Sequence, residues 1–591
     1  MTRLDRAAPS SSRAPALAFD PEGAAAASSA TTDVVGRIRI DHRRDLAAAL
    51  GIAVGELLDL DDAAVLLRAW ERWGVDCFAR IEGDFAAAIW DRRERRLVLA
   101  RDALGQRPLF YRRFGTGLAF AALPLPLAHL SGPARPDLQR LAGFLAGQPE
   151  TGERSFIAGV QRVQPGHWVM LNGAGALAEQ RWWNPDLTPL RLSLADGEDA
   201  VSCELRRAVA GMLSPAGILT AADLSGGLDS SLVVVTAAAL APERLLALTG
   251  ESADPFDRPA DCFLDEGERA AETAEAAGVP HRRVAVPPES PLAGLERWLP
   301  SSQAPFANAC NLGWMDALYG TARAAGAATY LVGARGNMTV SRNGIGRLAE
   351  LAGNFRLGTL GQELSAYRSY AGGSWPGLLA LAFGHLVPTA VWNRLAPPHR
   401  ARHSDPSGGA MLNPASPFLE RGVAQDAPDE SPAAAIAAMH MVDEGTTYHS
   451  VACRFGLDVR DPLGSRRLVE LCARLPAEHY FGGGRPRRLA RTLLAGKAPE
   501  RVVNARKRGY QGANWRAGFE RARPQLLAEV EAIDADPELG GLLDVARMRA
   551  TLQAWPGGNW TDWGQIETYR FTLMQAIGAA RFARFVRESG G

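Results

Sequence analysis

The sequence predicts a two-domain protein in which a strand-rich α+β domain precedes an α/β domain built on a parallel sheet. Its 591 residues exceed the roughly 250–300 residues that one hydrophobic core supports. Short β-like runs fill the first third of the chain. From about residue 200, strands and helices alternate, as in a parallel sheet covered by helices on both faces. We therefore expect a β-sandwich with flanking helices, followed by a parallel-sheet domain.

Composition excludes several classes of function. Acidic and basic side chains balance at 65 each, so no overall field attracts nucleic acid or an anionic membrane. The long apolar run at residues 377–392 contains a histidine and a proline and is too short to span a bilayer. The six cysteines form no CxxC pair, which argues against a zinc site or a disulfide scaffold. We expect a cytoplasmic protein that neither binds nucleic acid nor spans a membrane.

The first domain is expected over residues 33–183, after a segment 1–32 that is rich in Ala, Ser and Pro and is expected to be partly disordered. Turn signals such as DRRERR and NGAGA separate its strands. One helix is expected at Asp61–Gly74, where apolar residues recur at helical spacing behind an Asp cap. The expected strands are Val34–Ile40, Phe85–Asp91, Arg96–Asp102, Pro108–Phe114 and His167–Leu171.

The second domain is expected over residues 200–591, after a linker at Asn184–Ala200. Mobile connections are expected at 396–409 and 427–434, where Pro, Ser and Gly are frequent, and helices dominate after residue 433. The tryptophan-rich stretch 557–571 is expected to pack in the core. The elements expected in order are helix Gly197–Met212, strand Gly217–Ser225, a helix from Asp229, strand Arg244–Gly250, helix Asp265–Ala277, strand His281–Val286, helix Leu312–Ala325 and strand Thr329–Gly333.

The octapeptide LSGGLDSS lies between an expected strand and an expected helix. Glycines let backbone N–H groups approach a phosphate closely, and the N-terminus of the helix adds positive potential. Its aspartate would place a carboxylate beside phosphates, which is favourable when Mg²⁺ lies between them. The alternative is a Gly-Gly turn with a helix cap. The candidate nucleotide-binding residues are Leu224, Ser225, Gly226, Gly227, Leu228, Asp229, Ser230 and Ser231, with Leu248 and Gly333 at the ends of neighbouring strands.

This octapeptide resembles the pyrophosphate loop of the asparagine synthetase-like ATP pyrophosphatases. The blocks at Arg80–Tyr111 and Val160–Leu171 are similar to the amidotransferase domain of asparagine synthetase, and Gly456–Pro476 is similar to a segment that closes the synthetase site. The similarity covers most of residues 33–520. It implies an amidotransferase-like domain, an ATP pyrophosphatase domain, and ATP and Mg²⁺ as cofactors.

The sequence departs from that family in both domains. The family's glutaminase needs an N-terminal cysteine, but position 2 is Thr2 and the first cysteine is Cys77. The Asn-Gly dipeptide of the family's oxyanion hole is reduced to Val35-Gly36, so we expect a degenerate, inactive glutaminase. In the turn LVGARGN, the family's Glu is replaced by Ala334 and its metal-binding Asp by Asn337. The expected magnesium ligands are therefore Asp229 and Asn337.

Two residues are candidates for the catalytic step. Lys507, in KRGYQGANW, matches a β-lactam synthetase lysine that stabilises developing charge, and a solvated basic loop is the alternative. Glu444 matches the acid of the β-lactam synthetase dyad and could accept a proton from an attacking amine, although a helix-surface role is equally compatible. Arg460 falls where the family has a fixed arginine, for which a packing or ion-pair role is the alternative. The GYQGANW continuation is similar to lasso peptide macrolactam synthetases.

The resemblance implies a lasso peptide cyclase. Such an enzyme adenylates an Asp or Glu side chain of a leaderless peptide, and the N-terminal amine of the peptide then closes an isopeptide bond with release of AMP and pyrophosphate. Its implied partners are a leader peptidase, a leader-binding protein and an ABC exporter. One alternative is an amide, β-lactam or asparagine synthetase-type enzyme acting on a small molecule. Another is a nucleotide-binding regulator without activity.

Overall fold

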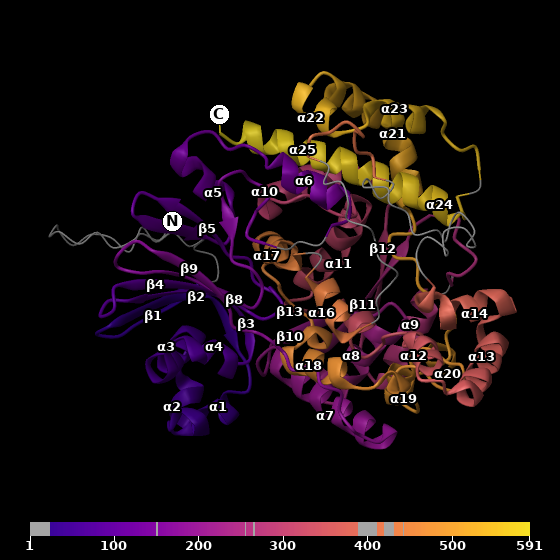
Figure 1. Ribbon diagram of the computed structural model, residues 1–591, viewed down its shortest axis with the longest axis horizontal. Helices are drawn as coiled ribbons and strands as arrows, with labels where there is room; N and C mark the ends of the chain where they lie inside the picture. The colour runs from indigo at the N-terminus through magenta and orange to yellow at the C-terminus, as the bar shows by residue number, and fades with distance from the viewer. Residues whose placement is uncertain are drawn as a thin grey trace.

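The chain folds into two domains that pack side by side (Figure 1). Residues 1–23 and the expected connection 396–409 lie outside the described residues, as do residues 427–430 of the connection expected over 427–434. The sheet of the first domain begins within segment 1–32, because β1 (Ala25–Ser28) pairs with β2 (Thr32–Ile40). The computed structural model describes residues 24–148, 152–254, 256–263, 266–387, 410–418, 431–440, 443–558 and 560–590.

The first domain contains two antiparallel sheets. Six strands pair in the order β1-β2-β3-β4-β8-β9, and three pair in the order β6-β5-β7. The expected strand at residues 167–171 has the bounds observed for β8, and the other expected strands agree within about two residues. The remaining strands are β3 (Gly83–Asp91), β4 (Arg96–Arg101), β5 (Phe110–Phe114), β6 (Gly117–Ala121), β7 (Gln161–Arg162), β8 (His167–Leu171) and β9 (Leu177–Arg181).

Alternation along β3 explains this sandwich. Phe85, Ala87 and Ile89 pack with the helices on one face of the large sheet, whereas Ala86 and Ala88 join the core shared with the small sheet. Successive strand residues point to opposite faces, so β3 is buried on both. The helices of this domain are α1 (Arg43–Leu50), α2 (Val54–Asp59), α3 (Asp62–Trp73), α4 (Cys77–Arg80), α5 (Leu125–Ala128) and α6 (Leu138–Leu145).

The second domain is built on a parallel five-stranded sheet. Its order is β12-β11-β10-β13-β14, so the chain fills one side of β10 and then crosses to the other. Ligands bind parallel α/β sheets beyond the carboxyl ends of the strands at such a switch point. The loops after β10 and β13 are therefore the expected binding edge. The strands are β10 (Leu219–Asp223), β11 (Leu245–Ser252), β12 (His281–Val286), β13 (Ala327–Leu331) and β14 (Asp458–Arg460).

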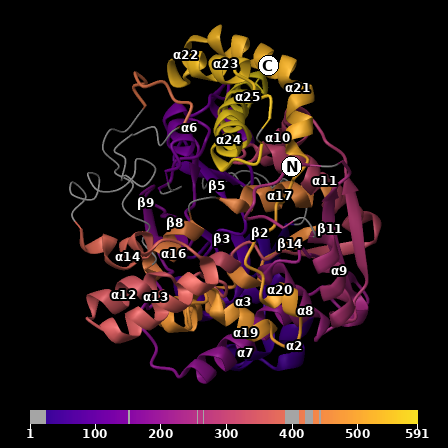
Figure 2. The same cartoon turned by 90° about the vertical axis from the view of Figure 1, so that its right-hand side faces the viewer.

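Helices cover both faces of this sheet. Leu246 and Leu248 of β11 pack in one core with α10, α11, α17 and α25, and Leu245 and Ala247 pack in the other with α7 and α8. Figure 2 shows α21, α23 and α25 together at one end of the molecule and α12–α14 away from them. The helices are α7 (Leu194–Met212), α8 (Leu228–Ala238), α9 (Glu266–Ala277), α10 (Pro291–Ser302), α11 (Leu312–Ala324), α12 (Gly346–Gly353), α13 (Leu357–Ala371), α14 (Trp375–Phe383), α16 (Pro432–Met439), α17 (Glu444–Phe455), α18 (Arg466–Arg474), α19 (Arg488–Leu494), α20 (Glu500–Val503), α21 (Trp515–Asp534), α22 (Pro537–Leu542), α23 (Val545–Gln553), α24 (Trp563–Ile566) and α25 (Met574–Glu588).

Two expectations about connections are corrected. The linker expected over 184–200 ends at Ser193, whose side chain accepts from the Asp196 N–H and caps α7 three residues earlier than expected. Part of the connection expected over 427–434 is helical, since α16 starts at Pro432. Proline favours the first turn of a helix, which explains that start.

The tryptophan-rich tail packs in the core as expected. Trp560 is buried and contacts Trp515, Trp555 and Tyr569 at ring-centroid distances of 4.9–5.6 Å. Among the described residues, no helix combines the length and the apolarity that crossing a membrane requires.

Candidate active site

The loop after β10 forms a tight turn of small residues. Gly226 has a φ of 67°, and a Cβ atom built there would lie 2.6 Å from the Arg269 Cβ. The Ser225 N–H donates to the Ser230 Oγ at 3.0 Å, and the two serine hydroxyls are also 3.0 Å apart. The Leu224 N–H donates to the Leu248 carbonyl, which ties the loop to β11. This turn therefore presents backbone and hydroxyl groups where a helix begins.

Asp229 lies in the first turn of α8 with one carboxylate oxygen buried. Within the described part of the chain, its Oδ1 has no hydrogen-bond partner. Burial raises the pKa of Asp229, and the Ser341 hydroxyl and the Arg487 charge partly oppose this. A Cβ atom on Gly336 would lie 2.4 Å from this oxygen. A buried carboxylate oxygen without a donor fits a Mg²⁺ ligand, because the cation would supply the missing charge.

The turn after β13 lies against Asp229. A Cβ atom on Gly333 would lie 3.2 Å from the Asp229 carbonyl oxygen, so the two loops are in close contact. Asn337 follows in the same turn, and its Oδ1 accepts from the Ser341 hydroxyl at 3.5 Å. The amide can offer one neutral oxygen to a metal. Ala334 adds no charge, so this edge holds fewer carboxylates than the family pattern implies.

Glu444 begins α17 and joins two polar groups. Its Oε2 accepts from the Tyr448 hydroxyl at 3.0 Å, one helical turn later, and lies 3.0 Å from Nη1 of the buried Arg335. Burial and the neighbouring Glu444 raise the pKa of Tyr448 well above its usual range. Burial also raises the pKa of Asp461 to about 7 against the charge of Arg335. Contacts with Tyr448 and Arg335 therefore hold the Glu444 carboxylate in place, and the Tyr448 hydroxyl is a proton donor beside it.

One cavity of about 660 Å³ connects these loops. Of the sequence candidates, Leu224, Ser225, Asp229, Ser230, Leu248, Gly333, Asn337 and Glu444 line it. The lining does not include the other four residues of the loop, Gly226, Gly227, Leu228 and Ser231. The volume lies within the roughly 300–1,000 Å³ of typical ligand sites. The structure therefore gathers most of the candidates around one space.

Lys507 is exposed and does not line this cavity, although Gly509 and Gln511 of the same loop do. Its neighbours are anchored. Arg506 donates to the Tyr370 carbonyl at 3.0 Å, and the Arg508 Cζ lies 3.9 Å from the centre of the Trp563 ring. Lys507 therefore lies outside the lining, between two arginines that contact neighbouring residues.

The sequence did not identify the contribution of the first domain to this cavity. Asp443, beside Glu444, accepts two hydrogen bonds from the buried Arg101 at 2.6 and 2.9 Å and one from Arg162 at 3.3 Å. Burial alone would raise the pKa of Asp443, but Arg101 and Arg162 lower it to about 2. Tyr448 could have been found from its spacing of four residues from Glu444 on a helix. No sequence pattern near Arg101 or Arg162 indicated that these residues contact Asp443.

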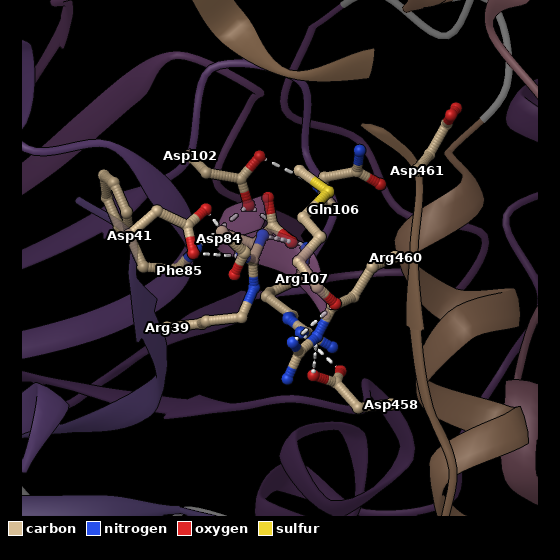
Figure 3. Close-up of polar contacts among 12 residues, drawn as sticks. Arg39, Asp41, Asp84, Phe85, Asp102, Gln106, Arg107, Asp458, Arg460 and Asp461 are labelled. Atoms are coloured by element: carbon tan, nitrogen blue, oxygen red, sulfur yellow. Dashed lines mark hydrogen bonds and ion pairs between the residues drawn. The ribbon is translucent and has the colours of Figure 1, made fainter. Parts of the chain in front are cut away.

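The interface between the domains contains a buried network of ion pairs (Figure 3). Arg107 of the first domain lies 2.5 Å from Asp458 of β14, and Arg460 pairs with the same carboxylate at 2.7 Å. Burial alone would raise the pKa of Asp458, but these arginines and Arg39 lower it far below its usual range. Arg460 also donates to the Met212 carbonyl. Arg460 therefore has the ion-pair role that was the alternative to a place in the site.

Val35 and Gly36 lie in the middle of β2. They pair with Ala88 and Ala87 of β3 on one side and with Ala26 and Ala25 of β1 on the other. A Cβ atom on Gly36 would lie 2.2 Å from the Ala86 carbonyl oxygen. The backbone at Val35 and Gly36 is therefore enclosed within a sheet.

The sequence matches two protein families. The asparagine synthase family matches residues 201–574, and the glutamine amidotransferase domain matches residues 45–183. Glutamine-hydrolyzing asparagine synthetase 3 of Bacillus subtilis is 30% identical over 235 residues, which are 38% of this chain and 38% of that protein. A putative glutamine-hydrolyzing asparagine synthetase of Mycobacterium tuberculosis is 28% identical over 229 residues, 37% of this chain and 34% of that protein. The chain thus aligns with less than two fifths of the length of each.

Among solved structures, the glutamine-dependent NAD+ synthetase of Acinetobacter baumannii overlaps with a TM-score of 0.17 at 19% identity. The overlap covers 33% of this chain and 39% of that chain.

Proposed function

Because this chain belongs to the asparagine synthase family, we propose that it uses ATP to activate a carboxylate and joins it to an amine. The observation that carries this proposal is the buried Asp229 Oδ1 at the switch point of the parallel sheet. When bound, Mg²⁺ at Asp229 and Asn337 would neutralise phosphate charge. The Ser225–Ser231 turn would hold the departing pyrophosphate, since glycines and a helix N-terminus favour phosphate there.

The first domain is proposed to be inactive as a glutaminase. Val35 replaces the asparagine of the resembled oxyanion hole, and the Gly36 backbone lies within the sheet. Stabilising an oxyanion requires donors aimed at open space, which this position lacks. The amine is then supplied by the substrate rather than by glutamine.

We propose further that the substrate is a leaderless peptide and the product a macrolactam, as in a lasso peptide cyclase. The Asp or Glu side chain would be adenylated, and the N-terminal amine would attack it near Glu444, which would accept the amine proton. Support comes from the GYQGANW resemblance and from the place of Glu444 in the cavity. A leader peptidase, a leader-binding protein and an exporter are the partners this proposal requires.

A small-molecule amide or lactam synthetase is the second candidate. The cavity volume of about 660 Å³ favours it, because that space suits a nucleotide with a small acid better than a long peptide. A peptide would need to extend beyond the cavity.

Pyrophosphate release and peptide mass test the proposed function together. The full-length chain is incubated with ATP, Mg²⁺ and a synthetic leaderless peptide that has a free N-terminal amine and an internal Asp. Pyrophosphate release and loss of one water are expected. Asp229→Asn should lower pyrophosphate release about hundredfold, since the metal loses its charged ligand. The exposed Asp196 offers a matched control, and Asp196→Asn should keep full activity.

Near-normal turnover by Asp229→Asn would refute the assigned metal site. Turnover of a small amino acid, with every tested peptide left unchanged in mass, would replace the peptide proposal by the small-molecule one.

A further inference from the structure

The cavity continues past Glu444 into the first domain. Residues from β5, α6 and the segment 154–162 line its far side, although this domain lies more than 200 residues away from Glu444 in sequence. We call this side the substrate wall, defined by Phe110, Arg140, Phe144, Ser155, Phe156 and Arg162. The loops proposed to bind the nucleotide lie in the second domain. The two ends of the cavity are therefore lined by different domains and by different types of side chain.

We propose that the substrate wall binds the peptide substrate through an aromatic or branched apolar side chain and a nearby carboxylate. This inference rests on the proposed function and specifies the peptide chemistry that the first domain recognises. It also gives that domain a function that needs no glutaminase chemistry.

Aromatic rings dominate the wall. Phe144 and Phe156 meet edge to face, with centroids 5.6 Å apart at 85°. Phe110 is buried beside them in the same core. Rings held in this way present large apolar surfaces without losing further conformational entropy when a ligand binds. An apolar side chain is the ligand group that suits them.

A guanidinium lies on this aromatic surface. The Arg140 Cζ is 4.4 Å from the centre of the Phe156 ring, and Arg140 is 8% exposed. Stacking uses the face of a guanidinium, and its edge carries the N–H donors that match a carboxylate. Arg162 also lines this wall and donates to the Asp443 carboxylate, as Arg101 does. The wall therefore combines an apolar surface with positive charge.

A continuous series of contacts joins the wall to the nucleotide end. Arg162 contacts Asp443, Glu444 follows in sequence, and Glu444 contacts Arg335, which lies in the turn against Asp229. Glu444 thus lies between the two ends. A peptide held by the wall would present its reacting groups beside Glu444 and the nucleotide loops, which is the proximity that amide formation needs.

Photocrosslinking of the full-length chain tests this inference. The probe is a synthetic leaderless peptide with a free amine, one Asp and p-benzoylphenylalanine at an apolar position. Crosslinks are expected within residues 138–163, and an excess of unlabelled peptide should suppress them. Phe144→Ala should weaken peptide binding about tenfold, because a large apolar contact is lost. Arg140→Gln, which removes the positive charge but keeps a polar side chain, should also weaken peptide binding.

Matched measurements separate recognition from folding. Phe114→Ala removes a ring of the same domain that is 52% exposed, and it should leave the crosslink yield unchanged. The affinity for α,β-methylene-ATP should stay the same in Phe144→Ala and Arg140→Gln. Crosslinks confined to the second domain, or absent altogether, would overturn the inference. Crosslinks at 138–163 without pyrophosphate release would uphold it and would count against the proposed function.

Discussion

At the scale of single residues, backbone geometry decides which positions of the loop tolerate a side chain. Gly226 combines a φ of 67° with a close approach to Arg269 and to the Glu266 carbonyl. Gly217, before the same strand, has a φ of 81° but faces open space. The motif predicted the need for glycine at 226 from phosphate access. The structure adds a second reason, because α9 packs directly behind the turn.

Gly226→Ala should therefore weaken nucleotide binding about tenfold, since strain and overlap must move the loop. Titration of α,β-methylene-ATP into the variant by calorimetry measures the effect. Gly217→Ala is the control for positive φ alone. It should lower the free energy of unfolding by about 1 kcal/mol and leave the affinity unchanged. Equal affinities for the two variants would show that the overlap at 226 is relieved without moving the loop.

At the scale of elements, contacts with the first domain position the start of α17. Arg101 donates to both oxygens of Asp443, the cap of α17. A Cβ atom on Gly445 would lie 2.5 Å from the Gly105 carbonyl oxygen. The start of this helix is therefore pressed against the first domain, and Glu444 is positioned by residues that are distant in sequence.

Arg101→Met should lower the free energy of unfolding by about 3 kcal/mol, because it leaves Asp443 in a buried site with one partner fewer. Hydrogen exchange at the first amides of α17 should also accelerate. The matched interdomain pair is Arg207 with Glu82, whose side chains are 19% and 20% exposed. Arg207→Met should cost about 1 kcal/mol and leave α17 exchange unchanged. Unchanged exchange in Arg101→Met would contradict a positioning role.

At the scale of the whole molecule, the two domains share buried polar and apolar contacts. The pairs around Asp458 lie at one part of the interface (Figure 3). At another part of the interface, His440 packs edge to face on Trp183. The His440 Nε2 lies 3.3 Å from the Ala103 carbonyl oxygen. Burial lowers the pKa of His440 from 6.5 to about 4.

Stability at this interface should depend on pH in a defined direction. Below pH 6.5 the unfolded chain protonates His440, whereas the folded chain does so only near pH 4. The folded state is therefore progressively disfavoured as pH falls through this window, and above it the contribution of His440 is fully present. Buried carboxyls with raised pKa values, such as Asp461, act in the opposite sense.

Comparison with His440→Gln isolates the histidine. Between about pH 7.5 and about pH 4.5, the wild-type chain should lose about 3 kcal/mol more unfolding free energy than the variant. Urea unfolding at the two pH values measures the difference. Parallel losses in both proteins would show that His440 takes up its proton in the folded state as easily as in the unfolded one.

The sequence by itself determined the parts that depend on near neighbours. The strands at 167–171 and 281–286 and the Asp61 cap of α3 agree with the expectations, because alternation and capping act within a few residues. The loop 224–231 was recognisable for the same reason. Its glycines, serines and aspartate are contiguous.

Only the tertiary structure decided what surrounds that loop. β14 has only three residues, which is too short to leave a periodic signal. Arg101 and Asp443 are 342 residues apart, and Arg335 and Glu444 are also distant in sequence. Such pairs form because burying a charge without its partner is unfavourable, so packing of the two domains selects them. That selection depends on the folded surroundings of each charge, which local sequence patterns do not contain.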